Sequence, residues 1–325
     1  QYTEIAGTPE LRSSLSTHMN KVYKGNTSLN NVLISSGCNQ AYCLTIMTLA
    51  KAGDEIILPE PYYFNHLMWL EMLGIKAKLM PFKPTQNGIP NPQDAERLLT
   101  KKTKAIVLIS PNNPTGAIYP PDIITSFYEF AREKEIALII DETYKDFLGS
   151  IQPHYLFQKK QWEETFIQIY SFSKVFSLTG YRVGSIIAGE KTIQSITKIM
   201  DTLAICAPRI SQDAALFGLA NLSNWVSKKQ KIIKERCDFV QGLFQSKDIN
   251  FEVVSCGAYF AYIKHPFVEL SARQVAMKLA KQANILCLPG TFFGPNQEHF
   301  LRFAFANASI EEMTLVEERL RQYYD

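Results

Sequence analysis

Side chains able to do acid–base or covalent chemistry follow several short apolar runs of this sequence, at the point where each run ends. Asp141 and Tyr144 follow one run, and Lys174 follows the next. Asn113 follows an earlier run, in the segment Ser-Pro-Asn-Asn-Pro-Thr-Gly. A lysine amine can form a Schiff base, and a carboxylate, a phenol and an amide can hold a protonatable ring beside it.

Groups that bind anions lie at two other places. Residues 35–40 read Ser-Ser-Gly-Cys-Asn-Gln, a glycine-containing turn that opens a helical pattern, and a helix N-terminus binds phosphate. Arg182 lies in a hydroxyl-rich stretch that begins at Ser171. Taken together, these groups suit a phosphorylated, protonatable ring that forms a Schiff base.

Each of these residues also has an ordinary interpretation when it is taken alone. A lysine after a strand is usually solvated, Asp141 could cap a turn, and Asn-Pro-Thr-Gly is a common turn composition. The functional interpretation rests on their convergence. Ligands of an open α/β sheet bind outside the carboxyl ends of the strands, which is where all of these residues are expected.

The elements that must position them alternate between strands and helices. Compact apolar runs that predict buried strands occur at 56–58, 105–109, 137–140, 166–170 and 185–188. Amphipathic stretches that predict helices include 40–51 and 123–135. This alternation predicts an α/β fold with a mostly parallel sheet covered on both faces.

The pattern of predicted strands and helices changes near residue 205. The sequence predicts one long connecting helix over 209–245. Strands near 251–254, 258–263 and 300–305 then interleave with helices near 271–283 and 310–323. We therefore expect a large domain at 1–208, the connecting helix, and a smaller α+β domain at 246–325.

The composition excludes several classes of protein. The 325 residues are 46% hydrophobic and 20% charged, which suits a chain with a sizeable core and not a disordered or fibrous one. A net charge of +3 with interspersed signs argues against nucleic-acid binding, and no apolar run predicts a membrane helix. The six cysteines lack zinc-site spacing, so we expect no metal, and free thiols suit a reducing, cytoplasmic location.

The order of these motifs resembles one known family over essentially the whole chain. The stretch Ser-x-Ser-Lys-x-x-Ser-Leu-Thr-Gly-x-Arg-x-Gly at 171–184 is its most specific feature, with Asn-Pro-Thr-Gly and Asp-x-x-Tyr upstream. These segments resemble the fold-type-I, pyridoxal-phosphate-dependent aminotransferases of class I/II, which are aspartate aminotransferase-like. The resemblance implies a seven-stranded, mostly parallel sheet in a large cofactor domain, with a smaller α+β C-terminal domain.

The resemblance also implies how pyridoxal 5'-phosphate would be held. Lys174 would carry it as a Schiff base and move the substrate's proton, which requires a lowered pKa. Asp141 would pair with the ring nitrogen, and Tyr144 and Asn113 would bond the phenolic oxygen. Tyr63 would stack on the ring. The groups expected at the phosphate are Gly37, Cys38, Asn39, Ser171 and Arg182, of which Cys38 replaces the more usual Gly or Ser.

Further positions match residues that surround the cofactor or the substrate. Arg302 would bind the substrate α-carboxylate, together with Asn113. His66 would hydrogen-bond Asp141 from behind, or it is an ordinary core histidine. Arg209 would read an acidic substrate side chain in a neighbouring site, or it is a surface arginine.

The start of the sequence suggests a homodimer and a missing segment. Tyr2 matches the family's tyrosine that crosses the dimer interface to the neighbour's phosphate. Family members carry several dozen residues before that position, forming an N-terminal arm, so we expect that the sequence from Gln1 lacks this arm.

The leading hypothesis is transamination between an L-amino acid and a 2-oxo acid. Two alternatives stay open at this point: a C–S or β-lyase reaction with the same cofactor, and a cofactor-sensing regulatory domain without turnover. The donor is also open. Aromatic lining from Tyr62, Tyr63 and Tyr259 would suit apolar or aromatic side chains, whereas Arg209 would suit acidic ones, with 2-oxoglutarate or pyruvate as acceptor.

Overall fold

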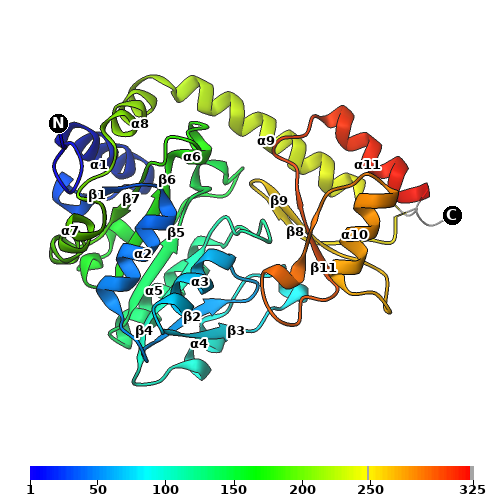
Figure 1. Ribbon diagram of the computed structural model, residues 1–325, viewed down its shortest axis with the longest axis horizontal. Coiled ribbons are helices and arrows are strands. Elements are labelled where there is room, and N and C mark those ends of the chain that lie inside the picture. The colour runs from blue at the N-terminus through cyan, green and yellow to red at the C-terminus, as the bar shows by residue number, and fades with distance from the viewer. Residues whose placement is uncertain (247–248, 323–325) are drawn as a thin grey trace.

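A seven-stranded sheet forms the larger part of the molecule (Figure 1). The computed structural model describes residues 1–246 and 249–322. The sheet order is β1-β7-β6-β5-β4-β2-β3, and all strands run parallel except β7, which is antiparallel to both β1 and β6. The strands are β1 (Val32–Ser35), β2 (Glu55–Pro59), β3 (Lys76–Met80), β4 (Thr103–Ile109), β5 (Ala137–Asp141), β6 (Phe166–Ser171) and β7 (Gly184–Ile187).

The central strands are buried on both faces because helices cover both sides of the sheet. Side chains of β6 are buried along its whole length, and those of β4 and β5 along nearly all of theirs. The covering helices are α1 (Pro9–Tyr23), α2 (Cys38–Leu49), α3 (Phe64–Met72), α4 (Pro92–Leu98), α5 (Pro121–Glu133) and α7 (Glu190–Ala204), and the short α6 (Phe172–Val175) follows β6. The expected mostly parallel α/β sheet is confirmed.

A second, four-stranded antiparallel sheet lies in the C-terminal part. Its order is β10-β11-β9-β8, and it has its own hydrophobic core, separate from that of the large sheet. Its elements are β8 (Glu252–Gly257), β9 (Phe260–Lys264), α10 (Ala272–Gln282), β10 (Leu288–Pro289), β11 (Phe300–Ala304) and α11 (Ile310–Gln322). Residues 247–248 and 323–325, at which parts of the expected small domain and of its last helix fall, lie outside the described residues.

The connection between the two sheets is two helices, and the expectation of one continuous helix over 209–245 is wrong. Helix α8 (Arg209–Asn221) ends at Leu222, and α9 (Ser223–Leu243) then runs to the small sheet (Figure 1). The side chain of Asn221 donates to the carbonyl of Phe217 at 3.0 Å. Asparagine and serine are favoured at helix ends, and Asn221 and Ser223 flank the break at Leu222.

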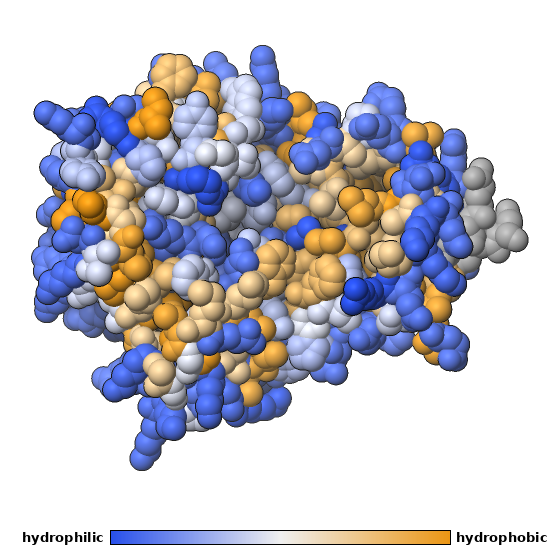
Figure 2. All heavy atoms as spheres, viewed as in Figure 1, coloured by the Kyte–Doolittle hydropathy of each residue, from blue (hydrophilic) through white to orange (hydrophobic). Residues whose placement is uncertain are grey.

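Short 3-10 helices complete the structure: η1 (Leu29–Asn31), η2 (Pro84–Gln86), η3 (Lys145–Phe147), η4 (Leu156–Gln158), η5 (Trp162–Glu164) and η6 (Gly290–Phe292). Among the described residues, no helix has both the length and the apolar character that a membrane crossing requires. On the face shown in Figure 2, hydrophilic residues occupy most of the outline, and apolar residues gather nearer the middle.

Candidate active site

A cavity of about 770 Å³ lies at the carboxyl edge of the large sheet, on the side that faces the small sheet. Asp141 ends β5 and Ser171 ends β6, so both side chains reach this edge. The cavity brings together most of the residues singled out in the sequence, namely Cys38, Asn39, Tyr63, His66, Asn113, Asp141, Tyr144, Ser171, Lys174, Arg182, Tyr259 and Arg302. The convergence of Cys38, Asn39, Asn113, Asp141, Tyr144, Ser171, Lys174 and Arg182 was predicted from their positions after successive strands, and that of Tyr63, His66 and Arg302 from the family resemblance.

Lys174 lies on the short helix α6, directly after β6. Its Nζ lies 5.9 Å from the centre of the Tyr144 ring, and its backbone carbonyl accepts a hydrogen bond from the Tyr259 hydroxyl at 3.4 Å. Burial, together with the charges of Arg182 and Arg302, lowers the pKa of Lys174. A larger fraction of this lysine is therefore a neutral amine, the form that acts as nucleophile and base.

Asp141 is buried and held by several donors. His66 Nε2 lies 3.3 Å from one carboxylate oxygen, and the backbone N–H and the hydroxyl of Thr143 donate to the other at 3.0 and 2.7 Å. Burial raises the pKa of Asp141, but the hydrogen bonds and charge of His66 and the bonds from Thr143 outweigh it, so the net pKa is lowered. The carboxylate is therefore anionic at neutral pH, and its contact with His66 is the one that the sequence resemblance implies.

The N-terminus of α2 faces the same cavity. Gly37 precedes this helix with a φ of 88°, and a Cβ at that position would lie 3.0 Å from Cζ of Arg182 and closer still to one guanidinium nitrogen. The backbone conformation therefore favours glycine, and a Cβ at this position would displace the Arg182 guanidinium. The α2 residues Cys38 and Asn39 line the cavity, and the Cys38 thiol donates to Asp141 at 3.5 Å.

Arg302 on β11 reaches the cavity from the small sheet. Its Nη1 donates to Oδ1 of Asn113 at 3.0 Å, and the guanidinium carbon lies 4.7 Å from the centre of the Phe260 ring. Its Nε is buried without a hydrogen-bond partner. A buried guanidinium donor without a partner is costly, and a ligand carboxylate would satisfy it.

Four of the residues selected from the sequence are not among those that line this cavity, and one of them is Gly37, which directly precedes α2. The Tyr2 side chain is 79% exposed, and Arg209 is exposed and paired with Asp213 at 2.8 Å on its own helix. Tyr62 donates its backbone N–H to the carbonyl of Phe293 and lies outside the cavity lining.

Several hydroxyl-bearing residues of the cavity were not selected from the sequence. Ser173 and Ser177 lie within the motif at 171–184 and line the cavity, as does Thr179, whose carbonyl accepts from Arg182 at 2.9 Å. Thr143 follows Asp141 by two residues. The sequence feature that pointed to them was their position within two motifs, the stretch 171–184 and the segment Asp-x-x-Tyr at 141–144.

Comparison with known proteins places this architecture in one family. The family model described as "Aminotransferase class I and II" matches residues 1–320. An aspartate aminotransferase of Pyrococcus horikoshii is 27% identical over 98% of this chain and 83% of the relative. The aromatic aminotransferase ISS1 of Arabidopsis thaliana is 27% identical over 99% of this chain and 81% of its own length.

The fold comparison agrees. The crystal structure of aspartate aminotransferase from Thermotoga maritima superimposes with a TM-score of 0.91 at 28% identity, covering 100% of this chain and 84% of that one. The family match spans both sheets and the cavity between them. The chain therefore belongs to the aminotransferase class I and II family of pyridoxal-phosphate-dependent enzymes.

Proposed function

We propose that the cavity at the sheet edge holds pyridoxal 5'-phosphate and transfers an amino group between an L-amino acid and a 2-oxo acid. The observation that carries the proposal is the meeting of Lys174, Asp141 and Arg302 in one cavity. These three supply an amine of lowered pKa, a buried anion and a partly buried guanidinium whose buried Nε has no partner.

The residues present fit this cofactor. The N-terminus of α2 and the guanidinium of Arg182 would bind its phosphate, and Ser171 would add a hydroxyl. Asp141 would pair with the protonated ring nitrogen. When bound, pyridoxal phosphate supplies an electron sink for the carbanion at the amino acid Cα.

Tyr144 and Asn113 would hydrogen-bond the cofactor's phenolic oxygen. Burial first, and then the nearby Asp141 charge, raises the pKa of Tyr144, so its hydroxyl stays protonated and can donate. Asn113 accepts from Arg302 through Oδ1, which leaves its amide N–H groups for the cofactor. Tyr63 lines the cavity and would stack on the ring.

Lys174 would attach the cofactor and, once freed, carry the proton that leaves the substrate Cα. Only its neutral amine can accept that proton, and the lowered pKa favours this form. Arg302 would hold the substrate α-carboxylate with its Nε and the free face of its guanidinium. The substrate would then lie between the two sheets, with Cα beside Lys174.

The lining also bears on the choice of amino donor. Among the described residues, the arginines and lysines that line the cavity are Lys174, Arg182 and Arg302. We have assigned them to the attachment of the cofactor, to its phosphate and to the substrate α-carboxylate, respectively. We infer that the lining of one chain suits uncharged or aromatic side chains, with Tyr259 and Phe64 as aromatic walls. An acidic donor would need a cation from a second subunit.

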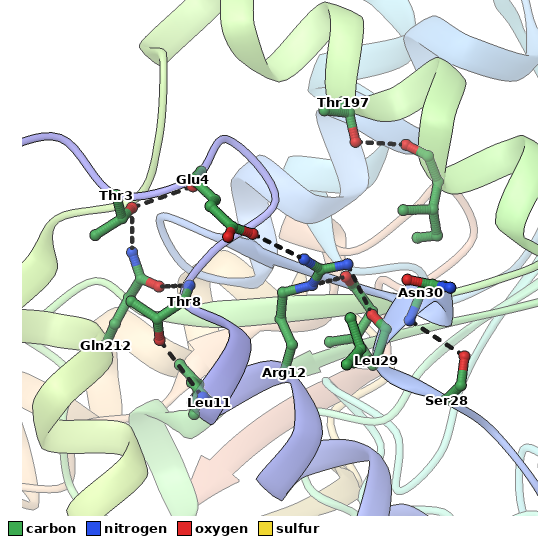
Figure 3. Close-up of polar contacts among 12 residues, drawn as sticks. Thr3, Glu4, Thr8, Leu11, Arg12, Ser28, Leu29, Asn30, Thr197 and Gln212 are labelled. Atoms are coloured by element: carbon green, nitrogen blue, oxygen red, sulfur yellow. Dashed lines mark hydrogen bonds and ion pairs between the residues drawn. The ribbon is translucent and has the colours of Figure 1, made fainter.

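A homodimer would bring a cation of the second subunit to the site. Ile210 and Phe217 on α8 are 69% and 60% exposed, and Tyr2 is exposed in the N-terminal segment. Figure 3 shows how that segment is anchored to α8: Gln212 donates to Thr3 at 3.0 Å and accepts from the backbone of Thr8 at 2.8 Å. Exposed apolar side chains on anchored elements favour a second copy of the chain as partner.

We also infer a reducing, cytoplasmic location, because all six cysteines are free thiols.

The test replaces Lys174 by alanine and measures 2-oxo acid formed from an amino donor with an oxo-acid acceptor. We expect the rate to fall about a thousandfold or more, because the group that moves the proton is lost. Lys198→Ala, on the exposed face of α7, is the matched control and should keep the wild-type rate. Release of pyruvate and ammonia without an acceptor would instead indicate a lyase, and normal turnover by Lys174→Ala would contradict the proposal.

A further inference from the structure

Two cysteines outside the active-site cavity lie in sulfur–sulfur contact. Cys237 is on α9 and Cys256 is on β8, 19 residues apart, and their Sγ atoms are 3.1 Å from each other. The Cys256 thiol also points at the carbonyl of Cys237, at 3.8 Å. The family resemblance accounts for neither residue, and neither belongs to the catalytic cavity.

Both thiols are open to small reagents. Each side chain is partly buried, and both line a second cavity of about 520 Å³ between α9 and the segment after η3. Lys234 and Asp238 line the same cavity, one on either side of Cys237 in the sequence. By contrast, Cys287 in the small sheet's core is buried.

The surroundings favour reaction at Cys237. The hydrogen bond from Cys256, helped by the charge of Lys234, lowers the pKa of Cys237, against burial and the charge of Asp238. The bond to Cys237 and burial raise the pKa of Cys256. The opposite directions of the two pKa shifts favour Cys237 as the attacking thiolate and Cys256 as the thiol that reacts second.

We propose that Cys237 and Cys256 are a redox-sensitive thiol pair that closes to an intramolecular disulfide between α9 and β8. With a hydroperoxide as oxidant, the Cys237 thiolate attacks the terminal peroxide oxygen and becomes a sulfenic acid, and the peroxide leaves as water or an alcohol. The Cys256 sulfur then displaces the sulfenic oxygen as water, forming the S–S bond. Overall, two thiols lose two electrons and two protons to one peroxide, and a thiol reductant reverses the change.

The disulfide would act as a staple and not as an on–off switch. The sulfurs must approach by only about 1 Å to reach a bonding distance of about 2 Å. Cys256 is three residues from Tyr259, which contacts Lys174, so a larger movement would reach the catalytic cavity. Because the closing movement is small, we expect the affinity for pyridoxal phosphate to change less than about twofold on oxidation.

Peptide mapping tests the proposal directly. The purified chain is treated with dilute hydrogen peroxide, blocked with an alkylating reagent and digested with trypsin without reduction. Cleavage after Arg236, Lys247 and Lys264 gives peptides 237–247 and 248–264, each with one of the two cysteines. We expect these peptides linked, with a mass about 2 Da below their sum, and a fall from six to four free thiols in the unfolded chain.

Three cysteine variants make the result specific. Cys237→Ser and Cys256→Ser should each abolish the linked peptide, whereas Cys287→Ser should leave it unchanged, and dithiothreitol should restore all thiols. The proposal is overturned if both peptides stay unlinked while their thiols are consumed, or if linkage forms equally well with other cysteines. A loss of cofactor affinity much beyond twofold in the linked form would overturn the staple interpretation.

Discussion

Lys174 shows how the protein tunes one side chain through its neighbours. Its pKa is lowered by burial and by the charges of Arg182 and Arg302, the two cations that we propose bind anions of the cofactor and the substrate. Under that proposal the same arginines would serve two purposes: they would bind anions, and they would keep the lysine amine reactive when those anions are absent.

This coupling predicts the pH dependence of lysine reactivity in the cofactor-free protein. Replacing Arg302 by methionine removes a nearby positive charge, so the pKa of Lys174 should rise and its amine should become reactive only at higher pH. The measurement is the rate of acylation of Lys174 against pH, followed by mass spectrometry. Lys198 in the same digest is the control, and its profile should not move between the two proteins. A downward shift for Lys174 would contradict the electrostatic cause.

The sequence predicted the principal site residues because their types are rare in combination. Arg302 carries a charge into an apolar strand, which is costly without a function, and Asp141 and Lys174 follow two successive apolar runs. Thr143 could not be selected in the same way, since threonine has many uses. Only the structure shows its two hydrogen bonds to Asp141.

At the scale of elements, the turn before α2 decides where an anion can bind. Gly37 and Gly53 both have a φ of 88°, but a Cβ at Gly37 would crowd Arg182, whereas a Cβ at Gly53 would have nothing within 4 Å. Comparing alanine substitutions at the two glycines therefore separates the free-energy cost of backbone strain from the cost of displacing the Arg182 guanidinium.

We predict that Gly37→Ala and Gly53→Ala each lower stability by about 1 kcal/mol, because alanine disfavours positive φ. Only Gly37→Ala should also weaken pyridoxal phosphate binding, by about tenfold or more, since Arg182 must move away from the helix N-terminus. Thermal unfolding and a fluorescence titration with the cofactor give the two quantities. Equal affinities in the two variants would exclude a role for the Gly37–Arg182 contact.

Elements with a strong local pattern were predicted, and those that depend on tertiary contacts were not. The runs at 105–109 in β4 and 137–140 in β5 are apolar throughout, and the run at 166–170 in β6 is interrupted only by Gln168, so these strands were recognisable from the sequence. β3 has two lysines in five residues and forms because it pairs with β2 at the sheet's edge. β10 has only two residues, too few for any periodicity.

At the scale of the whole molecule, the site is built between two separate cores. Arg302 from the small sheet bonds Asn113 from the large one, and Ser255 on β8 donates to the carbonyl of Thr115 at 2.8 Å. Gly116 lies so close to Gly257 that a Cβ there would be 2.7 Å from the Gly257 nitrogen. The turn at 112–116 is thus a point of contact between the two parts beside the cavity.

The proposed dimer gives a prediction at this scale. The double variant Ile210→Asp, Phe217→Asp places charges on the exposed apolar face of α8, so it should sediment as a monomer while the wild type sediments as a dimer. Met277→Asp on α10, where the methionine is 50% exposed, is the control and should stay dimeric. If the double variant remained a dimer, the interface would have to lie elsewhere.

The dimer also bears on which amino acids the enzyme accepts. One chain's cavity has no basic side chain left for a substrate side-chain carboxylate among its described lining residues. Arg209 is exposed at the start of α8, on the same helix as Ile210 and Phe217. Its partner Asp213 is also exposed, and such a surface pair is weak enough to exchange for a substrate carboxylate.

If Arg209 reaches the neighbouring subunit's site, its loss should affect one class of donor. We predict that Arg209→Ala lowers kcat/KM for aspartate by about tenfold or more, mainly through KM, because a carboxylate loses its only cation. The value for phenylalanine should stay within about twofold, since aromatic walls bind that side chain. Steady-state kinetics with both donors measure this selectivity. Asp213→Ala frees Arg209 from its ion pair, so it should increase the preference for aspartate over phenylalanine. Equal losses for both donors would mean that Arg209 supports the dimer and does not read the substrate.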